Sequence, residues 1–176
     1  TPIPRTIAMT VFGDLDDTRM SGMPSGRTPV ATYLADSANA AWVERTWARA
    51  AEEIAQGHRV YVVCPRIAAS DDVADAEEEG ARPLASVEEV AAYLRSHPAL
   101  SGVAIHELTG RTPSPVKAQI MEDFSTGRAP LLVATTVIEV GVDVSEATLM
   151  VILDAQQFGL AQLHQLRGRV GRSSLP

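Results

Sequence analysis

Short apolar runs rich in β-branched residues alternate with segments of helical pattern along most of this chain of 176 residues. The runs are apolar at consecutive positions, which is typical of strands buried on both faces of a parallel sheet. Strands of this kind, alternating with helices, predict an α/β fold: a three-layer sandwich with a mostly parallel central sheet. The predicted strands are "VATYLA" (30–35), "RVYVVCP" (59–65), "GVAIHEL" (102–108), "PLLVATT" (130–136) and "ATLMVILD" (147–154).

The segments between these runs carry helix signals. Helices are predicted over 37–57, 86–96 and 114–127, and a last one begins within 158–166. Ser37 or Asn39 can cap the first helix, and Ser86 with Glu89 forms a capping-box pattern at the start of the second. Gly127 suits the end of the third. The expected apolar faces are Val43, Trp47, Ala50 and Ile54 on the first helix and Val116, Ile120 and Phe124 on the third.

Two stretches depart from the alternation. Residues 1–27 run from the Pro-rich "TPIPR" into the breaker-rich "SGMPSGRTP" (21–29), which predicts a domain boundary near Arg27. Residues 66–85 are acidic and Ala-rich without a clean period, and are expected to form a loop or insertion. Because the chain lacks an initiator Met, we also expect it to be cut from a longer protein.

Composition excludes several kinds of site. The single cysteine, Cys64, excludes an internal disulfide and a Cys-rich metal site, and the four histidines lack metal-ligand spacing. The only lysine, Lys117, does not stand in a Gly-x-x-x-x-Gly-Lys pattern, so the chain has no P-loop. A net charge of −7 argues against a simple polyanion-binding protein. Without a span-length apolar run, a cytoplasmic protein with no membrane contact is expected.

The stretch "QLHQLRGRVGR" (162–172) carries three arginines within its last six residues. Arg169 and Arg172 are three residues apart, and two planar guanidinium groups so spaced suit the oxygens of a triphosphate. Gly168 lets the backbone approach a ligand closely. The alternative is a solvated basic helix end, since Arg-Gly patterns also occur in disordered RNA-binding tails.

Two further stretches follow predicted strands. In "VATTVIEVGVDV" (133–144), the hydroxyls of Thr135 and Thr136 are natural partners for phosphate oxygens, although such residues are also ordinary turn formers. In "TGRTPSPVK" (109–117), Gly110 and Arg111 precede a helix N-terminus, where phosphates bind. Ligands of parallel sheets bind beyond the carboxyl ends of the strands, so both stretches are candidate contact loops.

These stretches, in this order, resemble the second motor domain of superfamily 2 DNA helicases, most closely the RecG family of branched-DNA helicases. "TPIPRT" resembles the end of the motif that closes the first motor domain, and "VYVVCP" resembles motif IV. "VATTVIEVGVDV" and "FGLAQLHQLRGRVGR" carry the most specific part of the resemblance, as motifs V and VI. The translocase of the transcription-repair coupling factor family, which shares "TPIPRT" and the final motif, is the runner-up.

The resemblance implies a RecA-like domain from 28 to 176, truncated at its C-terminal end, preceded over 1–27 by the end of the first motor domain and a linker. It implies ATP as cofactor, with Mg²⁺ held by residues outside this chain, and branched DNA, the first motor domain and a wedge domain as partners. It also implies a bacterial, nucleoid-associated location. The residues that it places at the nucleotide are Gln165, Arg169 and the arginine finger Arg172, with Gly141, Asp143 and Gly168 near the cofactor; those at the DNA backbone are Thr135, Thr136, Gly110 and Arg111.

Three functions remain open from the sequence. The first is an inactive fragment of an ATP-dependent helicase, in which this chain supplies motifs IV to VI. The second is a RecA-like binding module that docks nucleic acid or protein without catalysis. The third is a small-molecule enzyme on a doubly wound sheet, for which no acid–base pair is visible.

Overall fold

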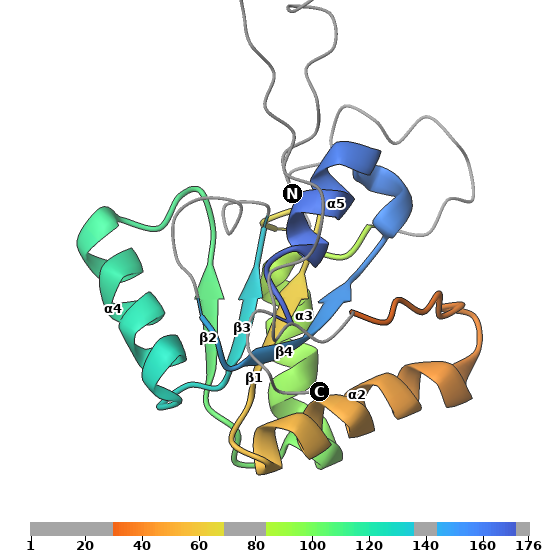
Figure 1. The fold of residues 1–176 in the computed structure, drawn as a ribbon, viewed down its shortest axis with the longest axis horizontal. Coiled ribbons are helices and arrows are strands. Elements are labelled where there is room, and N and C mark those ends of the chain that lie inside the picture. The colour runs from red at the N-terminus through yellow and green to blue at the C-terminus, as the bar shows by residue number, and fades with distance from the viewer. Residues whose placement is uncertain (1–29, 69–83, 136–143, 172–176) are drawn as a thin grey trace, which may run out of the picture.

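The computed structural model describes residues 30–68, 84–135 and 144–171. In these residues four strands form one sheet in the order β2-β3-β1-β4, and each neighbouring pair is parallel (Figure 1). The strands are β1 (Arg59–Val63), β2 (Ile105–Leu108), β3 (Leu131–Ala134) and β4 (Ala147–Ile152). The predicted parallel sheet is therefore confirmed.

Helices cover both faces of this sheet. α2 (Ala40–Ala55) and α3 (Val87–Ser96) pack on one face, together with the short η2 (Pro98–Leu100). α4 (Ser114–Thr126) and α5 (Leu160–Arg167) pack on the other, and η4 (Ala155–Gln157) lies between β4 and α5. The three layers predicted from the sequence are confirmed.

Alternate residues of each central strand supply the two apolar cores. On β1, Val60 and Val62 face the α2–α3 side, whereas Tyr61 and Val63 face the α4–α5 side. Phe124 of α4 is fully buried, and its ring centroid lies 4.7 Å from that of Tyr61. Side chains on successive strand residues point to opposite faces, so a strand covered on both sides must be apolar throughout.

Local signals set most helix ends. Asn39, not Ser37, caps α2, because its side chain accepts from the amides of Ala41 and Trp42. Ser86 caps α3 and also donates its hydroxyl to the Glu89 carboxylate at 2.7 Å. Gly127 follows α4 with φ of 79°, a left-handed conformation that favours glycine.

Two expectations are wrong. Residues 30–35 do not form a strand: they have no regular structure, and Tyr33 and Leu34 are 80% and 90% exposed. A β-forming run needs a neighbouring strand edge, and none of the four described strands pairs with it. Val116 does not belong to the buried face of α4 but is half-exposed; Met121 is buried there with Ile120 and Phe124.

The predicted acidic insertion is described only at its two ends. Arg66 and Ser86 form an isolated parallel bridge, and the amide of Val87 donates to the Arg66 carbonyl at 3.0 Å. The two ends of the segment are thus held side by side. The rest of the segment, and the predicted boundary near Arg27, lie outside the described residues. No helix in the described part of the chain is long and apolar enough to cross a membrane.

Candidate functional site

The carboxyl ends of β2 and β3 bring two of the predicted contact loops together. Leu108 and Ala134 are partners in the β2–β3 register, and the amide of Thr135 donates to the Leu108 carbonyl at 3.2 Å. Thr135 therefore lies beside the start of the "TGR" turn, as the sequence predicted for loops at this edge. Its side chain is buried, with the residue 9% exposed, so little of its hydroxyl reaches the surface of this chain.

Two threonines hold the turn after β2 in shape. The amide of Thr109 donates to the Thr112 hydroxyl at 3.0 Å, and the amide of Arg111 donates to the Thr109 hydroxyl at 3.2 Å. Gly110 and Arg111 lie exposed at the tip. The turn leads into α4, whose N-cap is Pro113 and whose first-turn amides donate to no capping side chain among the described residues. An exposed guanidinium next to an uncapped helix N-terminus suits a phosphate group.

α5 and the turn after it carry Gln165, Gly168 and Arg169, which the sequence predicted to lie near the nucleotide. α5 ends at Arg167, and the amide of Arg169 donates to the Leu166 carbonyl at 2.9 Å, so Arg169 lies in a turn just past the helix. Leu166 and Val170 are buried and anchor this turn in the core. The amide of Gly171 then approaches the carbonyl of Ala147, at the amino end of β4, to 3.4 Å.

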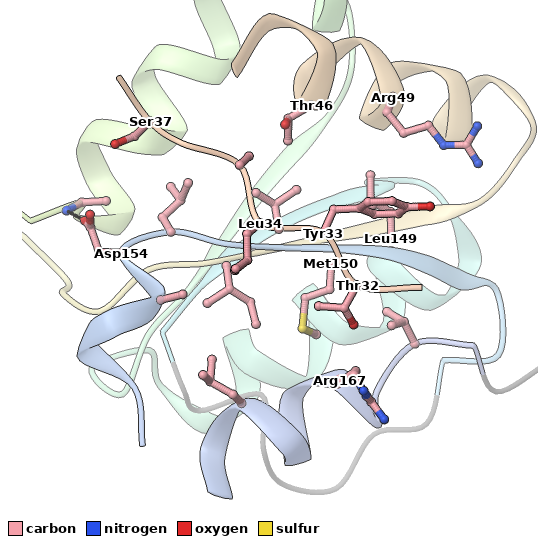
Figure 2. Close-up of a pocket in the computed structure, with 18 of the residues that line it drawn as sticks. Thr32, Tyr33, Leu34, Ser37, Thr46, Arg49, Leu149, Met150, Asp154 and Arg167 are labelled. Carbon is pink, nitrogen blue, oxygen red and sulfur yellow. Dashed lines mark hydrogen bonds between the residues drawn. The ribbon is translucent and has the colours of Figure 1, made fainter. Parts of the chain in front are cut away.

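Gln165 and Arg167 lie on different sides of α5. Arg167 lines a groove bounded by residues 30–35, β4 and α5, and Figure 2 shows its guanidinium close to the chain that follows the helix. Gln165 and Arg169 are not among the residues that line the groove. Arg169 lies past the end of α5, so helical spacing does not by itself place it on the same side as Gln165.

Arg169 lacks the carboxylate partner that several surface arginines have in the described residues. Arg45, Arg95 and Arg128 each pair with a carboxylate, at 2.6–2.7 Å for the shortest contact of each. Arg169 pairs with none of the carboxylates in the described ranges and is half-buried. A guanidinium held by a packed turn without a described counterion suits an anionic ligand.

The structure thus keeps the two predicted sets apart. Thr135, Gly110 and Arg111 lie at the carboxyl ends of β2 and β3, whereas Gln165, Gly168 and Arg169 lie along α5 and its return toward the amino end of β4. The remaining predicted residues lie outside the described residues: Thr136, Gly141, Asp143 and Arg172.

Sequence reasoning missed Asp154, which lies in the turn after β4. Its backbone is left-handed, with φ of 46° and ψ of 50°, and it is the one non-glycine residue of the described part with positive φ. Its carboxylate accepts a hydrogen bond from the Ala85 amide at 2.6 Å. An Asp directly after a buried strand was a usable signal, because Asp and Asn tolerate this conformation better than other side chains do.

The reasoning also missed a buried carboxylate on α2. Glu53 is 2% exposed and lies within 2.7 Å of His58 Nδ1 and 2.5 Å of the Thr148 hydroxyl, and Arg49 approaches it as well. Burial raises the pKa of Glu53, but the hydrogen bonds from Thr148 and His58 outweigh this and hold the pKa below its usual value. Nothing in the sequence distinguishes this Glu from its neighbour Glu52.

Cys64 is a core residue and not a nucleophile. It is fully buried at the end of β1, and burial, together with the charge of Asp154, raises the pKa of its thiol to about 12. In the described ranges no group of three or more His, Cys, Asp or Glu side chains is placed to hold a metal ion.

Comparison with known proteins agrees with this geometry. The chain is 46% identical to the ATP-dependent DNA helicase RecG of Mycobacterium bovis over all of its length, and 45% identical to that of Streptococcus pneumoniae over 98% of it. In both cases it spans 24% of the relative's length.

A solved structure of RecG bound to a three-way DNA junction is also similar to this fold. The TM-score is 0.72 at 37% sequence identity, and the match covers 98% of this chain and 20% of that one. The match extends over all four strands, so the RecA-like fold that the resemblance implied is confirmed. Residues 45–174 match the family of helicase conserved C-terminal domains, and the chain belongs to that family.

Proposed function

We propose that this chain is the second RecA-like motor domain of an ATP-dependent branched-DNA helicase of the RecG type, acting in recombination and repair on forks and Holliday junctions. Residues 28–176 form this domain, and residues 1–27 are the end of the first motor domain and the linker to it. A coupling-factor translocase is less well supported, because RecG proteins match the chain over its entire length. A bacterial protein of this kind acts in the cytoplasm at the nucleoid.

The observation that carries the proposal is Arg169 in its packed turn after α5. Leu166 and Val170 hold the turn in the core, and no described carboxylate neutralises the guanidinium. Gln165 precedes it by four residues and is exposed. The end of α5 and the turn after it offer a positive charge and an amide group that suit a nucleotide triphosphate.

The residues present fit an ATP that is shared between two domains. Arg169 and Arg172 bind phosphate oxygens and stabilise the charge that develops during phosphoryl transfer, with Arg172 as the arginine finger. Gln165 orients the groups around the phosphates, and Gly168, Gly141 and Asp143 approach the nucleotide. Bound Mg²⁺ neutralises phosphate charge, and its protein ligands belong to the first motor domain.

DNA contact belongs to the separate edge at β2 and β3. Arg111 at the tip of its turn, Gly110 beside it and the N-terminus of α4 meet the phosphate backbone. Thr135 and Thr136, which follow β3 in the sequence, are proposed to contact the same DNA backbone. Because the two sets lie in different places, hydrolysis at one and strand movement at the other must be coupled through the body of the domain.

The test uses the longer protein that contains this chain. Wild-type protein is expected to hydrolyse ATP faster in the presence of a three-way junction, and its sequence before Thr1 should carry a P-loop and a Mg²⁺-binding Asp-Glu box. Arg172→Ala should lower kcat by roughly 10³, the scale of arginine fingers. Arg172→Lys should rescue little, because an ammonium group lacks the planar fork.

The matched control is Arg45→Ala on α2, where Arg45 pairs with Glu52. This variant should hydrolyse ATP as wild type does. DNA affinity without nucleotide should be the same in all three variants. If Arg172→Ala kept its ATPase and lost DNA binding, the final motif would be a DNA contact. DNA binding with no hydrolysis by wild type would instead favour a binding module.

A further inference from the structure

Asp154 has an unfavourable backbone conformation at the point where the chain leaves β4. Left-handed φ and ψ crowd the Cβ of any L-residue, so the surrounding contacts must hold Asp154 in this state. Its carbonyl accepts from the Gln157 amide at 2.9 Å and starts η4. Phe158 is then buried in the α4–α5 core, and α5 begins two residues later. The conformation of Asp154 therefore sets the direction in which the chain enters α5.

The side chain of Asp154 ties this turn to a distant part of the chain. Its Oδ2 accepts from the amide of Ala85, 69 residues away, at 2.6 Å. Ala85 directly precedes Ser86, which caps α3 and forms the bridge to Arg66. Asp154 lies at one end of the groove of Figure 2, where Leu84 and Ala85 also line the wall.

The turn that carries Asp154 also contacts the end of β1. The amide of Leu153 donates to the Val63 carbonyl at 2.9 Å, so the turn sits directly over the end of β1. Cys64 follows there, and the charge of Asp154 contributes to the raised pKa of its thiol. The backbone of this turn thus contacts the end of β1, and the Asp154 carboxylate joins the turn to the start of α3.

We propose that Asp154 is a positioning residue: it locks the β4–α5 turn to the start of α3 and thereby sets the placement of α5, with Gln165 and Arg169. Its effect on ATP hydrolysis rests on the proposed function, whereas its effect on α5 does not. Asp154 itself contacts no nucleotide. The same hydrogen bond connects the end of the acidic segment, directly before α3, to the turn that leads into α5.

Three substitutions separate the parts of this lock. Asp154→Asn keeps a hydrogen-bond acceptor and tolerates left-handed backbone. Asp154→Gly keeps the backbone conformation but removes the acceptor. Asp154→Ala removes the acceptor and also disfavours the conformation. The control is Asp123→Ala on α4, which removes an equally well-bonded carboxylate whose partners, His106 and Arg128, lie away from α5.

The first measurement is amide hydrogen exchange on the chain itself. In Asp154→Gly, the amides of Ala85, Leu163 and Gly168 should exchange roughly tenfold faster or more, the factor expected for losing a hydrogen bond to a charged acceptor. Asp154→Asn should stay close to wild type, and Asp123→Ala should leave these three amides unchanged. Unchanged exchange of the α5 amides in Asp154→Gly would overturn the proposal.

The second measurement is steady-state ATP hydrolysis by the longer protein with saturating junction DNA. Asp154→Gly should lower kcat about tenfold with little change in KM for ATP, because a displaced arginine loses contacts made in the transition state. Asp154→Asn should restore kcat, and Asp123→Ala should not lower it. An equal loss of kcat in Asp123→Ala would show a general loss of stability and refute the positioning role. If wild type hydrolyses no ATP, the proposed function fails, and the exchange experiment alone decides the lock.

Discussion

Removing the Thr148 hydroxyl, which bonds the buried carboxylate of Glu53, tests whether α2 and β4 are joined by a charged hydrogen bond as well as by apolar packing. Thr148 on β4 donates to Glu53 on α2 at 2.5 Å, across 95 residues of sequence. Thr148→Val keeps the shape of the side chain and deletes only this donor. A hydrogen bond to a charged group contributes about 1.5–3 kcal/mol. Since His58 and Arg49 still contact the Glu53 carboxylate, we expect a loss near the lower end, about 1.5–2 kcal/mol.

The assays are urea unfolding, which gives the free energy of unfolding, and thermal unfolding, both followed by the fluorescence of Trp42 and Trp47, which lie on α2. A loss of this size should lower the melting temperature by roughly 3–8 °C, at about 2–4 °C per kcal/mol for a chain of this size. The matched control is Thr46→Val, whose hydroxyl donates to the Trp42 carbonyl within the same helix. We expect the control to change stability by less than about 0.5 kcal/mol.

The effect should depend on pH in a defined direction. The pKa of Glu53 is lower in the folded chain than in the unfolded one, so the ionised carboxylate stabilises the fold above its unfolded pKa. This stabilisation is lost as the pH falls through the folded pKa. The difference between wild type and Thr148→Val should therefore be full at pH 7 and shrink below about pH 4. The hydrogen bond to a charged Glu53 would be refuted if wild type and Thr148→Val differed in stability by the same amount at pH 3 and pH 7. A difference below about 0.5 kcal/mol at pH 7 would refute it as well.

Three further outcomes are expected of the isolated chain. It should not hydrolyse ATP, because it has no P-loop lysine; turnover that Arg172→Ala abolishes would contradict this. Its DNA binding should be weak, with a slope of log K against log salt of about −2 to −3, and Arg111→Ala should reduce the slope by about 1. Cys64 should react with a thiol reagent only as fast as the chain unfolds, because its thiol is buried and its pKa lies at about 12; fast labelling of the folded chain would show that the end of β1 opens.

Local rules placed most elements of this fold from the sequence alone. Residues 60–63 and 131–134 are apolar throughout, which is typical of strands covered on both faces. Ser86 and Gly127 marked helix ends because capping and left-handed backbone depend on the residue itself and its nearest neighbours. The motif around Arg169 was recognisable for the same reason, since its residue types and spacing are local.

The tertiary structure alone decided what depends on partners distant in sequence. The run at 30–35 has every local feature of a strand, yet without a paired edge it stays irregular. Val116 has helical spacing but faces outward, because the crossing of α4 over the sheet, and not its period, selects the buried residues. Glu53 meets Thr148, and Asp154 meets Ala85, only after the sheet has brought segments 95 and 69 residues apart together. The sequence shows which groups can form hydrogen bonds, but the tertiary structure determines their partners. Only polar groups that are buried away from water must bond to another group of the protein.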